Sequence, residues 1–180
     1  MEYCNDASYL EKKLETRKKE IKNEAKLKAY AIQILEALKA THRSNVIHAD
    51  MKLPNILMNC PTLDEKQAGE TNVLKLCDFG VAQVITPGDF NGKKKALMKE
   101  RCGSGNYIAP EIKRDGTIVG PEIDMWGFGI VLYEMCVAYK PTQCRRDYKY
   151  GQGPIPFRQQ DWRKLSKGGS AVQDLILQCL

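Results

Sequence analysis

Apolar side chains recur at helical spacing in the first quarter of the chain. They fall at i, i+3, i+4, i+7, i+8 and i+11 and form one continuous stripe: Leu27, Tyr30, Ala31, Ile34, Leu35 and Leu38. Residues 124–137 are apolar on nearly every side, which is typical of a helix buried in a core. A third helix is expected over residues 171–180, and the capping-box pattern Ser8-x-x-Glu11 predicts a helix that starts at Ser8.

Short runs of β-type residues lie between the predicted helices, at residues 46–47, 56–58 and 73–77. The other connecting segments contain Pro, Gly and charged residues, and we expect irregular structure over residues 60–72, 81–102 and 139–170. A loop as long as residues 81–102 inside a compact domain is usually functional or mobile, so this segment is a candidate for part of a site.

The composition is that of an ordinary globular protein. The chain has 180 residues, 43% of them hydrophobic and 28% charged, which is enough for one domain with an apolar core. No apolar run approaches the length of a membrane span, and residues 1–6 do not resemble a secretory signal. Seven cysteines without a C-x-x-C pair or zinc-type spacing indicate reduced thiols. We therefore expect a protein of the cytoplasm or the nucleus, without a membrane partner.

Much of the positive charge lies in two lysine-rich stretches of a chain whose net charge is +6. In residues 12–28 glutamates are interleaved with lysines, which favours a solvated helix with i,i+4 ion pairs. Residues 93–95 are three consecutive lysines in a glycine-flanked loop. Neither stretch has the aromatic residues that stack on nucleic-acid bases. A basic nucleic-acid binder is therefore the weakest interpretation, and no nucleic-acid partner is expected.

Four short motifs follow one another along the chain. They are H-A-D-M-K-L-P-N at residues 48–55, D-F-G at 78–80, A-P-E at 109–111 and D-M-W-G-F-G at 124–129. Each alone is an ordinary turn, cap or surface pattern, but their order and their positions beside predicted strands favour one common site. With them the chain resembles the eukaryotic protein kinase family, whose signatures are H-R-D-L-x-x-x-N, D-F-G and A-P-E in this order.

The resemblance covers essentially the whole chain, and residues 1–4 look like the hinge between the two lobes of a kinase. It implies an α+β fold, namely a mainly α-helical C-terminal lobe with a few short strands around the catalytic and D-F-G loops. We therefore expect residues 1–180 to be a partial protein kinase domain, hinge and C-terminal lobe, that stops before the last helices of the family.

The resemblance implies that three polar side chains take part in Ser/Thr phosphotransfer to protein hydroxyls. Asp50 would accept the proton of the attacking hydroxyl and orient it. Lys52, two residues later as in the Ser/Thr-type kinases, would place positive charge near the transferred phosphoryl group. Ser104 stands where that group usually has Thr, and its hydroxyl would bridge Asp50 and Lys52.

ATP and Mg²⁺ are the cofactors that the resemblance implies. The metal ligands would be Asn55, through its amide oxygen, and Asp78, through its carboxylate. Both groups suit a hard cation that prefers oxygen. Lys52 and Leu57 would complete the cofactor-binding set together with these two residues.

Other residues near the motifs are expected to be structural. His48 is expected to be a packed core histidine and Cys77 a small buried residue. By resemblance, Asp124 would anchor the backbone of the His48 loop from below, and Trp126 would pack under the same loop. None of these four residues is expected to take part in the chemistry.

The sequence departs from the family in three places. It contains no Gly-rich phosphate loop and no lysine-bearing strand, so we expect the 180 residues alone to bind ATP weakly and to be inactive. Ala49 replaces the Arg of H-R-D, which in the family pairs with a phosphorylated activation segment. Glu111 is expected to lack the Arg partner that later helices supply in the family, at a cost in stability if it is buried.

Two interpretations of different classes stay open. In the first, the chain is part of a Ser/Thr kinase whose intact parent transfers phosphate, with protein substrates, its own missing N-terminal lobe or a regulatory protein as partners. In the second, it is a non-catalytic kinase-like interaction module, such as a pseudokinase or a truncated regulator. The presence of Asp50, Lys52, Asn55 and Asp78 together favours the first.

Because Ala49 cannot pair with a phosphate, we predict that the intact parent is active without phosphorylation of residues 78–111. The hydroxyl-bearing residues of this segment are Thr86, Ser104 and Tyr107. Thr86→Ala in the parent should leave the phosphotransfer rate within about twofold of the wild type, because position 49 has no arginine that could pair with a phosphate group. A radiolabelled-ATP assay measures the rate, and a large loss of activity would contradict the prediction.

Overall fold

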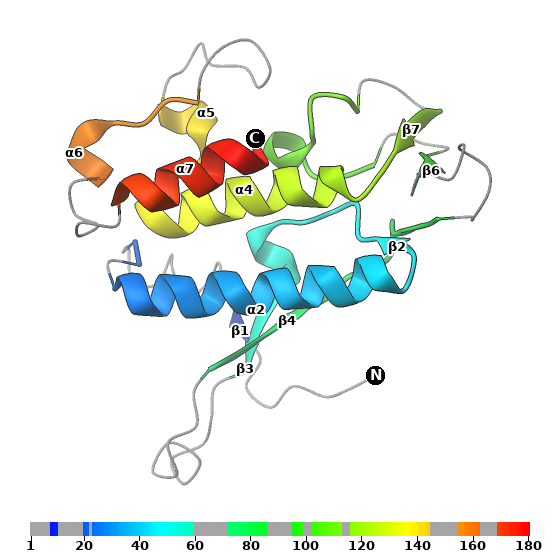
Figure 1. The fold of residues 1–180 in the computed structure, drawn as a ribbon, viewed down its shortest axis with the longest axis horizontal. Coiled ribbons are helices and arrows are strands. Elements are labelled where there is room, and N and C mark those ends of the chain that lie inside the picture. The colour runs from blue at the N-terminus through cyan, green and yellow to red at the C-terminus, as the bar shows by residue number, and fades with distance from the viewer. Residues whose placement is uncertain are drawn as a thin grey trace, which may run out of the picture.

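A computed structural model describes residues 8–10, 20–21, 23–59, 72–85, 95–98, 102–112, 116–144, 155–162 and 169–180. Within these ranges the elements are α-helices and short antiparallel strands. Helix α4 (Glu122–Val137) lies between α2 (Glu24–Arg43) and α7 (Gly169–Cys179), and the strands lie beyond α2 and at one end of the helices (Figure 1). None of the helices described is long and apolar enough to cross a membrane.

Helix α2 buries the apolar stripe that the sequence predicts. Five of its six members are fully buried and Leu35 is half-buried. The helix begins after Asn23, whose side-chain oxygen accepts a hydrogen bond from the backbone N–H of Lys26 at 2.9 Å and so satisfies a free donor of the first turn. His42 and Arg43 in the last turn place basic side chains at the negative end of the helix dipole.

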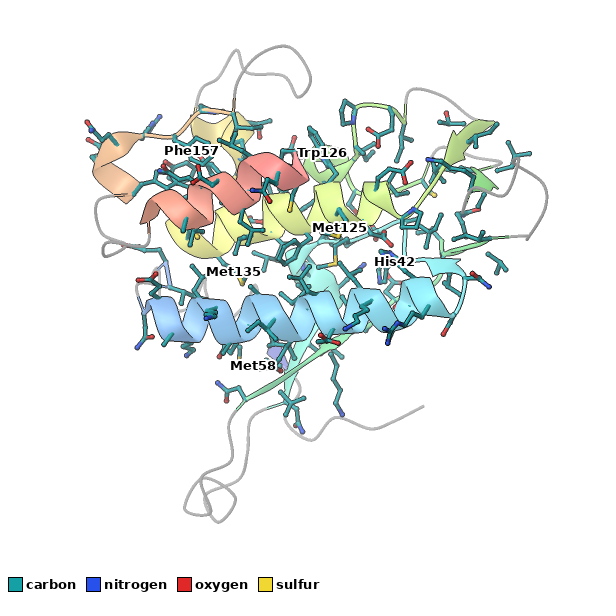
Figure 2. The ribbon with its side chains drawn as sticks, in the orientation of Figure 1. His42, Met58, Met125, Trp126, Met135 and Phe157 are labelled. Carbon is teal, nitrogen blue, oxygen red and sulfur yellow. The ribbon has the colours of Figure 1, made fainter. Side chains whose placement is uncertain are left out.

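Helix α4 forms the centre of the core. From Ile123 to Val137 its side chains are buried, except for half-buried Met125 and Glu134. Met125 and Met135 lie on the side of α4 that faces α2 (Figure 2). Burial raises the pKa of the Cys136 thiol to about 12, so this cysteine stays protonated and packs as an apolar residue. The nearly continuous apolar sequence of this helix is thus explained by neighbours on several sides.

Strand β3 (Ile56–Asn59) is the middle strand of an antiparallel sheet between β1 (Ser8–Tyr9) and β4 (Val73–Leu76). Ser8 pairs with Met58 in this sheet. The expected helix start at Ser8 is therefore wrong, because the backbone there is extended along β3 and helical structure begins at Leu10.

A second strand pair brings two sequence motifs together. Strand β2 (Val46–Ile47) directly precedes the H-A-D motif and pairs with β5 (Gln83–Val84), which follows D-F-G. The paired strands β3 and β4 flank the same two loops on their other sides. Since both ends are joined by antiparallel ladders, the loops at residues 48–55 and 77–82 run side by side.

Several short elements lie in segments that the sequence predicts to be irregular. Strands β5 and β6 (Ala96–Met98) lie within residues 81–102, and β6 pairs with β7 (Thr117–Val119). The helical turns α5 (Pro141–Cys144) and α6 (Gln159–Trp162) lie within residues 139–170. The irregular structure expected there is corrected in these places, because elements of two to four residues leave no readable period in a sequence.

At Gly127 the backbone of α4 approaches the loop at residues 48–55 closely. A Cβ added to this residue would lie 2.7 Å from the Cβ and 2.8 Å from the carbonyl oxygen of Met51. Contacts this short do not occur in folded proteins without a shift of one partner, and here one partner is backbone. The missing side chain of Gly127 therefore lets the backbone of Met51 pass directly against the helix.

We predict that Gly127→Ala lowers the free energy of unfolding by about 1–3 kcal/mol, because overpacking against Met51 outweighs the better helix propensity of Ala. Urea denaturation measures the change. Without the clash, the substitution would stabilise the helix by about 1 kcal/mol, so a more stable variant would contradict this packing. Ala29→Gly, at an exposed position of α2, is the control that reports the propensity effect alone.

Candidate active site

The carboxylate of Asp124 holds the start of the loop at residues 48–55. It is fully buried in the first turn of α4 and accepts hydrogen bonds from the backbone N–H groups of His48 and Ala49, each at 2.8 Å. The ring nitrogen Nε2 of His42 lies 2.7 Å from the same carboxylate. Three donors compensate the burial of this charge. The expected anchoring role of Asp124 is confirmed.

His48 joins this loop to the D-F-G loop. Its Nδ1 accepts the backbone N–H of Asp50 at 3.2 Å, so Nε2 carries the proton and donates it to the carbonyl of Cys77 at 3.0 Å. The ring of Phe79 packs edge-on against the imidazole, with the centroids 4.7 Å apart. His48 is fully buried with both nitrogens engaged, which confirms that it is a core residue.

Lys52 is the central member of a polar triad that it forms with Asp50 and Ser104. Its Nζ donates to Oδ2 of Asp50 at 2.5 Å and to Oγ of Ser104 at 2.6 Å. The expectation that the Ser104 hydroxyl forms the bridge is corrected, because in the described part of the chain that hydroxyl contacts Lys52 and not Asp50. The long lysine side chain spans the gap between the two loops, which a serine cannot. The lysine and aspartate side chains are only 19% and 9% exposed, so solvent screens their ion pair weakly.

Asn55, at the end of the 3-10 turn Leu53–Asn55, turns its amide nitrogen toward Asp50. Its Nδ2 donates to the backbone oxygen and to Oδ2 of Asp50 at 2.9 and 3.0 Å. The side-chain oxygen of Asn55 faces the other way and makes no hydrogen bond to a described residue. Fixing the nitrogen in this way leaves the amide oxygen available to a cation.

Asp78 enters the site next to Asn55. The backbone carbonyl of Asn55 accepts the N–H of Cys77 at 3.0 Å, so the next residue begins at the same end of the loop. Asp78 is exposed and has φ of 64°, in the left-handed region that non-glycine residues rarely adopt. One of its oxygens accepts the N–H of Gly80 at 3.3 Å. Backbone strain of this kind is typical of functional loops.

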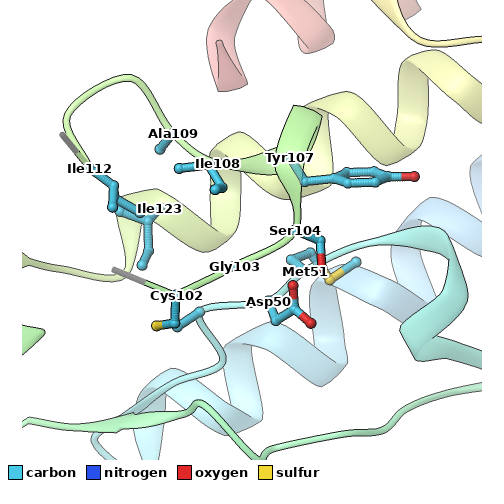
Figure 3. Close-up of a pocket in the computed structure, with 11 residues that line it drawn as sticks. Asp50, Met51, Cys102, Gly103, Ser104, Tyr107, Ile108, Ala109, Ile112 and Ile123 are labelled. Carbon is cyan, nitrogen blue, oxygen red and sulfur yellow. The ribbon is translucent and has the colours of Figure 1, made fainter. Parts of the chain in front are cut away.

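A small cavity of about 10 Å³ adjoins Asp50 and Ser104, close to the space of one water-sized group (Figure 3). Oδ2 of Asp50 is occupied by Lys52 and Asn55, whereas Oδ1 is buried and has no hydrogen-bond partner among the described residues. A buried acceptor without a donor costs about 1–3 kcal/mol. A hydrogen-bond donor from outside the chain would therefore gain the most binding free energy at Oδ1 of Asp50.

These motifs and their geometry agree with one protein family. The family model described as the protein kinase domain matches residues 1–180. The chain belongs to the protein kinase family. The α+β fold expected with this family is confirmed by the helices and short antiparallel strands of the structure.

The chain is similar to named kinases from distant organisms. It is 37% identical over 141 residues to "Carbon catabolite-derepressing protein kinase" of Secale cereale, a match that covers 78% of this chain and 24% of that protein. It is 37% identical over 109 residues to "Calcium/calmodulin-dependent protein kinase type IV" of Homo sapiens, covering 61% and 20%. For "SNF1-like protein kinase ssp2" of Schizosaccharomyces pombe the identity is 38% over 109 residues, covering 61% and 16%. The matches thus span about a quarter or less of these relatives.

The structure also gives the location and burial of three other residues that the kinase resemblance names. Leu57 is half-buried on β3, between Tyr9 of β1 and Lys75 of β4, and its role in cofactor binding stays a prediction. Trp126 is buried in α4. Glu111 is exposed, so the stability cost expected of a buried carboxylate without its partner does not arise.

Motif matching alone does not find two contacts of this kinase site. His42 lies 82 positions before its partner Asp124. The hydroxyl of Tyr107, in the 3-10 turn Gly105–Tyr107, donates to Glu134 at 2.5 Å, and Lys140 lies 3.7 Å from the same carboxylate. The available signal for the second contact is a glutamate in the apolar stretch of α4 that follows Asp124, since such a group needs a partner when it is removed from solvent.

We predict that Asp124→Asn destabilises the chain by about 1–3 kcal/mol, because the amide nitrogen would face a backbone N–H and leave two donors opposed. Urea denaturation measures this loss, and hydrogen exchange should accelerate at the amides of His48 and Ala49. Asp174→Asn on the exposed side of α7 is the matched control and should change stability by less than about 0.5 kcal/mol. Equal stabilities of the two variants would contradict the anchoring role.

Proposed function

We propose that this chain supplies the acceptor and metal side of a Ser/Thr protein kinase. The intact parent would transfer the γ-phosphate of ATP to hydroxyl groups of protein substrates. One observation carries the proposal: the buried Oδ1 of Asp50 has no donor in the described part of the chain, while Oδ2 is held by two neighbours. The names of the similar proteins, all protein kinases, support the same reaction class.

Asp50 would act on the acceptor. A substrate hydroxyl in the adjacent cavity would donate its hydrogen bond to Oδ1, and this bond would orient the hydroxyl oxygen and receive its proton as the bond to phosphorus forms. Lys52 and Asn55 fix the other oxygen at 2.5 and 3.0 Å, so the carboxylate cannot rotate away. Lys52 also carries positive charge into a site that is largely closed to solvent, where it would stabilise a phosphoryl group.

The residues present fit Mg²⁺. Among the described residues no group of three or more His, Cys, Asp or Glu side chains could hold a metal, but Mg²⁺ usually keeps several waters and needs only one or two protein oxygens. The exposed carboxylate of Asp78 and the amide oxygen of Asn55 are such a pair. When bound, Mg²⁺ would neutralise charge on the phosphate oxygens of ATP. Leu57 and Lys52 would belong to the nucleotide side.

A non-catalytic interaction module is the second candidate. Ala49 favours it, since this residue stands where the family has the arginine of H-R-D. A parent protein of this kind would use the lobe as a docking surface for a regulatory protein and would transfer no phosphate. The two candidates differ in what substitution of Asp50 does to the parent.

The decisive experiment uses the intact parent in a radiolabelled-ATP assay with a Ser- or Thr-containing protein substrate. We predict that Asp50→Asn lowers kcat by at least about 100-fold, because it removes the general base and keeps the shape of the side chain. Lys28→Ala is the control, at an exposed position in the N-terminal half of α2, and should leave the rate unchanged. Equal thermal stability of the variants excludes unfolding. A wild-type parent without turnover, or an active Asp50→Asn variant, would overturn the proposal.

A further inference from the structure

A groove lies between the C-terminal half of α2 and the first turn of α4. Its volume is about 400 Å³, within the range of ligand-binding clefts. Figure 2 shows His42 on α2 and Met125 on α4 at this junction. The lining residues described are three apolar and three basic side chains: Leu35, Leu38, Met125, Lys39, His42 and Arg43.

The polar side of the groove is cationic. Arg43 is exposed, and its guanidinium has no hydrogen-bond or ion-pair partner among the residues that the structure describes. Lys39 lies 3.2 Å from Glu36, one turn earlier, and both side chains are at least half exposed. Such a surface pair contributes little and is readily exchanged for another carboxylate. The groove therefore favours a ligand that carries apolar groups beside negative charge.

His42 connects the groove to the catalytic loop. It lines the groove, and its Nε2 lies 2.7 Å from Oδ2 of Asp124. The same oxygen accepts the backbone N–H of His48 at 2.8 Å. Two hydrogen bonds thus separate the groove from the backbone that carries Asp50. A ligand that fixes the ring of His42 would also fix the carboxylate that holds the loop.

We propose that this groove docks a short amphipathic helix of a partner protein, and that docking steadies the catalytic loop through His42 and Asp124. The partner helix would place apolar anchors at i, i+3, i+4 and i+7 on the floor of the groove and acidic side chains beside Arg43 and Lys39. A second copy of the chain fits less well, because each copy carries a net charge of +6 and the copies repel. This docking site goes beyond the proposed phosphotransfer and does not depend on it.

Binding is tested on the full 180-residue chain by fluorescence anisotropy. The probe is a fluorescein-labelled peptide of about 15 residues with Leu anchors, Glu at the positions that face Arg43 and Lys39, and Ala at the others, because Ala favours a helix and Glu side chains at all of those positions would repel one another. Arg43→Glu should weaken binding at least about tenfold, because it reverses the charge at the rim. Lys28→Glu makes the same kind of charge reversal on the same helix, about 20 Å from Arg43, and should change binding by less than about twofold.

A peptide with Lys in place of Glu should not bind measurably. Equal binding of the two peptides, or an Arg43→Glu variant that binds as well as the wild type, would overturn the docking site. Dimerisation of the chain that Arg43→Glu abolishes, without any peptide binding, would assign the groove to a second copy and also overturn it. Circular dichroism of the variants excludes a loss of folding.

The coupling has its own readout. Bound peptide should slow hydrogen exchange at the backbone amides of His48 and Ala49 several-fold in the wild type. In His42→Ala the peptide should still bind, but this slowing should disappear, since the connection to Asp124 is missing. Slowing of the same size in His42→Ala would overturn the coupling while leaving the docking site in place.

Discussion

The hydrogen bonds of Asp124 to the loop at residues 48–55 are the interactions on which the rest of the site depends. Its carboxylate is fully buried and accepts two backbone N–H groups and a histidine ring nitrogen, at 2.7–2.8 Å. Charge-assisted hydrogen bonds of this kind are about twice as strong as neutral ones. Since α4 is packed on several sides, the carboxylate has a fixed position, and the loop inherits that position. The side chain of Asp50 is therefore oriented by a helix far away in the sequence.

Two antiparallel strand pairs do the rest of the positioning. The pairs β2–β5 and β3–β4 join the loop at residues 48–55 and the D-F-G loop at both ends. His48 then crosses between the loops: its Nδ1 accepts the backbone N–H of Asp50, and its Nε2–H donates to the carbonyl of Cys77. A single neutral tautomer thus connects the backbone of Asp50 with the loop of Asp78. Groups placed by paired strands and buried hydrogen bonds keep their geometry better than groups on free loops.

Long periodic segments, ordered motifs and the β-type runs that became β2, β3 and β4 could be predicted from the sequence, whereas the other short elements and the non-local contacts could not. The stripe of α2 and the buried run of α4 each span several turns, so their period is readable. Strands β5, β6 and β7 have two or three residues and exist only because distant partners pair with them. The contact of Lys52 with Ser104 depends on the length of the lysine side chain, which the spacing of the motifs does not reveal. The partner of His42 is Asp124, 82 positions away in the sequence.

The replacement of arginine by Ala49 is compatible with this architecture because the structural task of position 49 belongs to its backbone. The residue has φ of 63°, a left-handed conformation that costs about 1–2 kcal/mol for a residue with a Cβ. The hydrogen bond from its N–H to Asp124 offsets this cost. The methyl group of Ala49 is itself buried, so alanine fills this position without exposing apolar surface. The negative charge of Asp50 is balanced by Lys52, at 2.5 Å, so the geometry around Asp50 does not require an arginine at position 49.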